Sequence, residues 1–117
     1  MSTIDKIYSN SIGMSFYWKE KLETSLPKIQ IVFCNTGFLL SFYELKDFAT
    51  FCHDSMKTAP CASCDKKNKC RNLLLRTPSD KIDLAVNREE LQQIERLINE
   101  TIFRIEKRRW ITSPCPN

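Results

Sequence analysis

The fold is decided by residues 29–45, which read Ile29-Gln30-Ile31-Val32-Phe33-Cys34-Asn35-Thr36-Gly37-Phe38-Leu39-Leu40-Ser41-Phe42-Tyr43-Glu44-Leu45. Two apolar runs flank Asn35-Thr36-Gly37, a pattern typical of two strands joined by a tight turn. Ser41 then stands three residues before Glu44, which is the spacing of a capping box at a helix start. This stretch therefore predicts a β-hairpin that leads directly into a helix.

The second half of the chain repeats this arrangement. Two short apolar runs, Leu73–Arg76 and Lys81–Val86, flank Thr77-Pro78-Ser79-Asp80, where proline suits the second position of a type I turn. Asn87 and Glu90 then provide a second cap, and apolar residues follow at helical spacing to about Lys107. The chain therefore predicts two hairpin–helix units.

One more strand is expected before these units, because Ile12, Met14, Phe16 and Trp18 alternate with Gly13, Ser15 and Tyr17. The predicted fold is α+β, a mainly antiparallel sheet of four or five strands with two helices on one face, in the order β-β-β-α-β-β-α. The expected parts of this single domain are strands over 8–43, a helix over 44–56, a cysteine loop over 57–70, a hairpin over 71–86, a helix over 87–108 and a tail over 111–117. The expected core residues are Ile31, Phe33, Phe38, Leu40, Leu45, Phe48, Leu73, Leu75, Leu84, Val86, Leu91, Ile94, Ile98 and Ile102.

Length and composition bound the class of protein. A chain of 117 residues with 42% hydrophobic and 27% charged residues can bury one core, and its net charge is only +4. No apolar run approaches the roughly 18 residues of a membrane span. The first residues also lack the basic and apolar regions of a secretory signal. A cytoplasmic protein without membrane contact is therefore expected.

The sequence resembles a small bacterial family that is classed only as a domain of unknown function. The resemblance covers roughly residues 8–108, and its most specific part is the Thr-Pro-Ser turn with the following Glu-Leu helix start. It is carried by Ile29–Phe33, Asn35, Gly37, Glu44, Thr77-Pro78-Ser79, Leu84, Asn87, Glu90 and Leu91. It implies a compact α+β domain and no activity. Family members often carry a Cys-x-x-Cys pair after the first strand, where this chain has Trp18-Lys19-Glu20-Lys21-Leu22, so no metal role carries over.

Chemistry is concentrated in one cysteine-rich segment. Cys52, Cys61, Cys64 and Cys70 lie within 19 residues, together with His53, which is the only histidine. A Cys-x-x-Cys turn can direct two thiolates at one ion, and Cys70 with Cys52, or alternatively His53, completes a tetrahedral set. The spacing therefore predicts a structural zinc site.

Three other interpretations of the same cysteines stay open. Cys61, Cys64 and Cys70, with Cys52 as the fourth ligand, also match the spacing of some iron–sulfur proteins. Cys61 and Cys64 could instead form a redox dithiol. Alternatively Cys61, Cys64 and Cys70 are free thiols or form disulfides, and Cys34 and Cys52 are simply small buried side chains. With two glycines in the chain, a nucleotide-binding glycine loop is nearly excluded.

Three functional hypotheses follow. The first is a non-enzymatic binding or regulatory domain. The second is a nucleic-acid-binding domain that uses the basic loop and the end of the last helix, Arg108-Arg109-Trp110. The third is a thiol redox or iron–sulfur protein. Phe103 and Trp110 fall outside the apolar stripe of the last helix, which suggests a homodimer contact.

Overall fold

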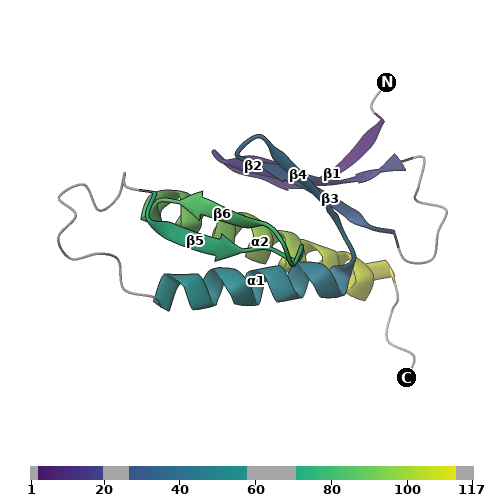
Figure 1. Cartoon of the computed structure of the whole chain (residues 1–117). Helices are drawn as coiled ribbons and strands as arrows, with labels where there is room; N and C mark the ends of the chain where they lie inside the picture. Colours follow the sequence, from purple (N-terminus) through teal and green to yellow (C-terminus); the bar gives the residue numbers. More distant parts are fainter. Residues whose placement is uncertain (1–2, 20–26, 58–70, 113–117) are drawn as a thin grey trace.

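The computed structural model describes residues 3–19, 27–57 and 71–112. In these ranges the elements follow the order β-β-β-β-α-β-β-α (Figure 1). The elements are β1 (Ile4–Ser9), β2 (Gly13–Trp18), β3 (Ile29–Phe33), β4 (Thr36–Leu40), α1 (Phe42–Lys57), β5 (Leu73–Arg76), β6 (Asp83–Val86) and α2 (Arg88–Thr112). The predicted α+β class is confirmed.

The first four strands form one antiparallel sheet in the order β1-β2-β3-β4, so β1 and β4 are its edges. The β5–β6 hairpin forms a separate two-stranded sheet. The prediction that both hairpins share one sheet was therefore wrong. The reason is that an apolar run indicates a strand without indicating which strand it pairs with.

The sequence pattern did not predict strand β1, because the alternation of its residues is interrupted. Asp5 and Lys6 lie in its middle, and the register with β2 shifts between Lys6 and Tyr8. This bulge breaks the two-residue period on which recognition of a strand depends. Strand β2 also begins at Gly13 rather than Ile12, and a Cβ at Gly13 would collide with the carbonyl oxygen of Val32.

The β3–β4 hairpin turns one residue earlier than predicted. Cys34 and Asn35 form the two-residue turn, with φ angles of 50° and 61°. Two consecutive left-handed residues are typical of a type I′ turn, whose twist matches that of the flanking strands. Thr36 and Gly37, which were expected in the turn, are therefore the first residues of β4. Cys34, which was expected to be a buried side chain of the strand, is instead an exposed residue of the turn.

Both helices begin with the predicted capping boxes. At α1, the Glu44 amide donates to Ser41 Oγ (3.2 Å) and the Ser41 amide donates to Glu44 Oε1 (2.9 Å). At α2, the Glu90 amide donates to Asn87 Oδ1 (2.7 Å) and the Asn87 amide donates to Glu90 Oε1 (3.0 Å). Helix α2 continues to Thr112, beyond the predicted end at 108, because the first proline after it is Pro114.

The core lies between the two helices and one face of the four-stranded sheet, with the β5–β6 hairpin beside α1 (Figure 1). The predicted core residues are buried, except that Leu84 and Ile102 are half-buried against the same core. Ser15 and Thr101 are fully buried, and their hydroxyl oxygens lie 2.6 Å apart. This hydrogen bond joins β2 to α2. Neither α1 nor α2 has the combination of length and apolar character that a membrane-crossing helix needs.

Candidate functional site

The predicted metal ligands divide into two groups. Cys61, Cys64 and Cys70 lie outside the described residues, whereas Cys52 and His53 lie on α1. The Cys52 side chain is 0% exposed and packs in the core, and burial raises the pKa of its thiol. His53 is exposed, with Nδ1 3.8 Å from Glu95 Oε2. Among the described residues, no group of three or more His, Cys, Asp or Glu side chains is placed to hold a metal ion. The zinc site stays a prediction.

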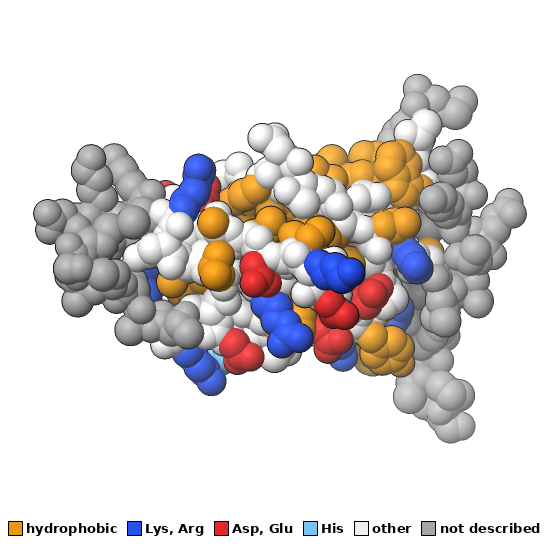
Figure 2. All heavy atoms as spheres, in the orientation of Figure 1, with side chains coloured by type: hydrophobic (Ala, Val, Ile, Leu, Met, Phe, Trp, Pro, Cys, Tyr) orange, Lys and Arg blue, Asp and Glu red, His pale blue; other side chains and the backbone are white. Residues whose placement is uncertain are grey.

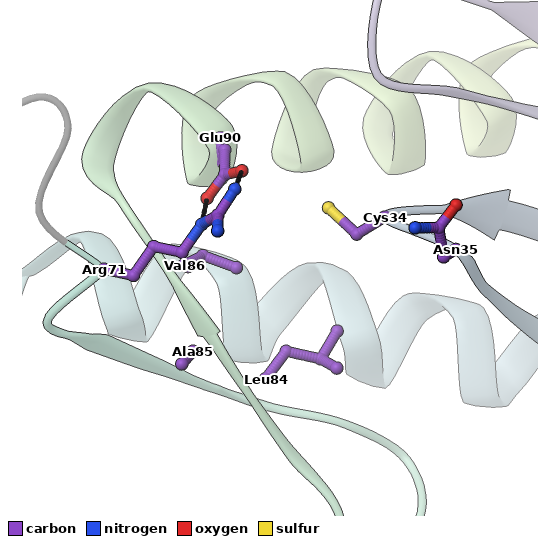
Figure 3. Close-up of a pocket in the computed structure, with 7 residues that line it drawn as sticks. All are labelled: Cys34, Asn35, Arg71, Leu84, Ala85, Val86 and Glu90. Carbon is purple, nitrogen blue, oxygen red and sulfur yellow. Dashed lines mark hydrogen bonds and ion pairs between the residues drawn. The ribbon is translucent and has the colours of Figure 1, made fainter.

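A cavity of about 310 Å³ lies beside the β3–β4 turn. Figure 3 shows Cys34 and Asn35 on one side of it, and Arg71 and Glu90 on the other. The remaining lining comes from β6 through Leu84, Ala85 and Val86. The sequence does not indicate that these residues lie together, because the β3–β4 turn and the β5–β6 hairpin are far apart in the chain.

The charged groups of this cavity bind each other. Arg71 donates to both carboxylate oxygens of Glu90, at 3.0 and 2.8 Å, and Glu90 also accepts the Asn87 amide of the helix cap. Burial and the nearby Glu90 carboxylate raise the pKa of the Cys34 thiol, against an opposing effect of Arg71. A thiol that is harder to ionise is a poor nucleophile. The ion pair and the helix cap therefore account for the charged groups that line this cavity.

The basic end of α2 is also occupied within the molecule. Arg108 Nη1 lies 3.1 Å from Asp5 Oδ2, and Arg104 Nε lies 3.7 Å from Glu100 Oε1. The guanidinium of Arg109 stacks 4.3 Å from the centre of the Phe42 ring. Nucleic-acid bases stack on free aromatic faces, and phosphates pair with available cations. Most of the basic loop lies outside the described residues, and Trp110 at the end of α2 is exposed, so the nucleic-acid hypothesis stays a prediction.

Phe103 and Trp110 are 59% and 76% exposed, as their position outside the apolar stripe suggested. They lie on α2 and do not belong to the core. Tyr43 is similarly exposed near the start of α1.

The most unusual surface is the outer face of the four-stranded sheet, which we define by the side chains that share it in the strand register. Both helices lie on the other side of the sheet (Figure 1). In a sheet with one solvated face, the strands usually carry polar residues on that face. Here the outer face is mostly apolar, and its only charged member is Lys6. Its residues are Ile4, Lys6, Ser9, Met14, Phe16, Trp18, Gln30, Val32, Gly37 and Leu39.

These side chains form a cluster of their own. Phe16 is only 6% exposed, yet it does not belong to the core between sheet and helices. Its ring meets the Trp18 ring edge to face, with centroids 5.1 Å apart. Val32 and Leu39 are 37% and 40% exposed on the same face. In Figure 2 hydrophobic side chains gather over the sheet.

Gln30 holds the outer face in place at its centre. The Trp18 indole N–H donates to Gln30 Oε1 (3.1 Å), and Gln30 Nε2 donates to the carbonyl oxygen of Phe38 (3.2 Å). The one polar group of the Trp18 ring is thereby satisfied within the sheet.

Sequence reasoning identified β2 but not the direction in which it faces. A half-buried strand is expected to turn its apolar residues to the core. In the structure the smaller and more polar set, Ser15 and Tyr17, faces the helices, while Met14, Phe16 and Trp18 face outward. The missed signal was Ser15, whose hydroxyl requires the buried partner that Thr101 provides.

Comparisons of the chain with protein-family models, with curated proteins and with solved structures gave no match. The resemblance to the bacterial family of unknown function stays a prediction.

Proposed function

We propose that this protein is a small binding domain that holds a partner protein against the outer face of its four-stranded sheet. The observation that carries the proposal is the cluster of Met14, Phe16, Trp18, Val32 and Leu39 on a sheet face that neither helix covers. Contiguous apolar surface of this kind is typical of sites of protein association. A functional role would explain why the apolar residues of β2 face away from the core.

The charge of the face favours a protein partner over a polyanion. Lys6 is its only charged member, so a nucleic acid would find almost no phosphate contacts there. Aromatic and methionine side chains, by contrast, are enriched at the centres of protein interfaces. The partner we expect has an apolar, mainly uncharged contact surface, such as the apolar side of an amphipathic helix.

The proposal is tested by photo-crosslinking from two positions in cells that produce the protein. A photoreactive residue at position 14 lies on the outer face, and one at position 92 lies on the exposed side of α2 as a matched control. We expect a protein to be captured from position 14 and not from position 92. The captured protein is then purified and its affinity is measured directly.

Binding of that purified protein should be at least about tenfold weaker for Met14→Asp, because an interfacial carboxylate loses its water. It should be unchanged for Gln92→Asp. Added salt should change the affinity little, since the outer face carries few charges. Equal affinities for the two variants, or capture of nucleic acid with a steep salt dependence, would contradict the proposal.

A further inference from the structure

The free edge of β4 presents backbone groups in a pattern that the strand register defines. Phe33 and Thr36 close the two-residue turn, so these two residues exchange both backbone hydrogen bonds. In an antiparallel pair such residues alternate with residues whose groups point away. Gly37 and Leu39 therefore direct their N–H and C=O groups away from β3. Within residues 3–19, 27–57 and 71–112, nothing forms a hydrogen bond with these four groups.

We propose that a second copy of the chain pairs with this edge, β4 antiparallel to β4, and joins the two sheets into one. When Gly37 stands opposite Leu39 of the second copy, the four free groups of each strand meet the four of the other. The pairing is symmetric, because a two-fold axis between the two copies of Phe38 exchanges the two strands. It forms four backbone hydrogen bonds and needs no change in the β3–β4 pairing.

The outer face fits the same register. Gly37 lies beside Val32, and its φ angle is not left-handed, so the backbone conformation does not require glycine there. A Cβ at Gly37 would meet Gln30 Nε2 at 3.1 Å and Val32 Cγ2 at 3.8 Å, so the glycine makes room for the Gln30 side chain. In the paired register, Leu39 of the second copy stands opposite Gly37 on the outer face and would lean over the glycine towards Val32. These two exposed apolar side chains would thus cover each other.

The charges of the two edges distinguish β4 from β1. Strand β4 reads Thr36-Gly37-Phe38-Leu39-Leu40 and contains no charged residue, so two copies do not repel each other. Strand β1 carries Asp5 and Lys6 and a bulge, which are devices that keep an edge strand from pairing. The sequence therefore blocks one edge of the sheet and leaves the other open.

This inference goes beyond the proposed function, because it concerns backbone groups at the edge rather than side chains on the face. Pairing covers Val32 and Leu39 at the joined edge, whereas the part of each outer face around Met14 and Trp18 stays open, so each dimer would present two such surfaces. The two proposals can fail separately. A monomeric protein would leave partner binding at Met14 untouched, and a dimer without a captured partner would leave the pairing intact.

Sedimentation equilibrium from micromolar to near-millimolar concentration tests the pairing in the full chain. We expect a monomer–dimer equilibrium that Leu39→Pro weakens at least about tenfold, because proline removes an edge donor from each copy and its ring blocks the approach. Leu39→Ala keeps the donor and should weaken the dimer less. Far-UV circular dichroism and thermal unfolding show whether both variants remain folded.

Hydrogen exchange measured by NMR supplies a test that requires no variant. The Gly37 and Leu39 amides should exchange more slowly as the protein concentration rises, whereas the Phe38 amide, bonded to β3, should be protected at every concentration. A wild-type protein that stays monomeric, exchange that does not depend on concentration, or a dimer that Leu39→Pro leaves intact would each overturn the proposal. The last result would place the contact elsewhere, for example at Phe103 and Trp110.

Discussion

At the scale of single residues, the β3–β4 turn stores backbone strain. Cys34 and Asn35 both have left-handed φ angles, and a residue with a Cβ other than asparagine or aspartate adopts this conformation at a cost of about 1 kcal/mol. We expect Cys34→Asn to raise the free energy of unfolding by about 0.5 kcal/mol. Cys34→Val should lower it by more than about 1 kcal/mol, because β-branching disfavours this region further. Urea denaturation measures both, and a Val variant as stable as the Asn variant would refute the turn assignment.

Substitution of Cys52 distinguishes a packing role in the core from a role as a zinc ligand. Its thiol is enclosed by apolar side chains, so Cys52→Ala should reduce the free energy of unfolding by about 1–2 kcal/mol through the small cavity it leaves. From this burial we expect the ratio of zinc to protein, measured on protein purified without oxygen, to be the same in the variant and the wild type. A folded Cys52→Ala protein that has lost bound zinc would instead establish Cys52 as a ligand.

The Arg71–Glu90 pair makes stability depend on pH. The hydrogen bond from Arg71 lowers the pKa of Glu90 below its ordinary value of 4.5, against the opposing effect of burial, and the Asn87 amide lowers it further. A carboxylate whose pKa is lower in the folded state stabilises the protein above its unfolded pKa, and this contribution is lost as the pH falls.

We therefore expect wild type to be more stable than Arg71→Met at pH 6, with the difference shrinking as the pH falls below about 4.5. Chemical denaturation at several pH values measures this difference. A difference that stays constant down to pH 3 would show that the pair does not contribute through ionisation.

At the scale of elements, what could be predicted was what the local sequence encodes. Both helix starts followed from a cap and an acid three residues later, and the structure shows the expected reciprocal bonds at Ser41 and Asn87. The hairpins followed from apolar runs around polar turns. Strand β1 did not, because a bulge and two charged residues removed its period. Neither the outward direction of β2 nor the cavity at Cys34 could be predicted, since both depend on contacts between distant segments.

The hydrogen bond between Ser15 of β2 and Thr101 of α2 fixes the direction in which β2 faces. Thr101 Oγ1 donates to the Leu97 carbonyl oxygen (2.6 Å), which leaves it able to accept from Ser15. We expect Thr101→Val to lower the free energy of unfolding by about 1–2 kcal/mol, because a buried hydroxyl loses its partner. The double variant Ser15→Ala/Thr101→Val should be less destabilised than the sum of the two single variants. Additive effects in this double-mutant cycle would show that the two hydroxyls are not coupled.

At the scale of the whole molecule, the chain divides its apolar residues between two clusters. One cluster lies between the sheet, the hairpin and the helices, and it accounts for the stability of the fold. The other lies on the outer face around Phe16 and Trp18, where no helix is packed. A folded domain does not need the second cluster to bury its core. Its presence is the reason why we propose the outer face of the sheet, rather than the cysteines or the basic end of α2, as the binding surface.

The central claim is that this outer face is open to apolar molecules in solution. NMR titration with 8-anilinonaphthalene-1-sulfonate, a dye that binds exposed apolar protein surfaces, tests it most directly. We expect chemical-shift changes that concentrate at Met14 and Trp18, with changes at Val32 and Leu39 only at concentrations where the protein is monomeric. Changes confined to the cavity beside Cys34 or to the exposed side of α2, or no binding by the folded protein, would contradict it.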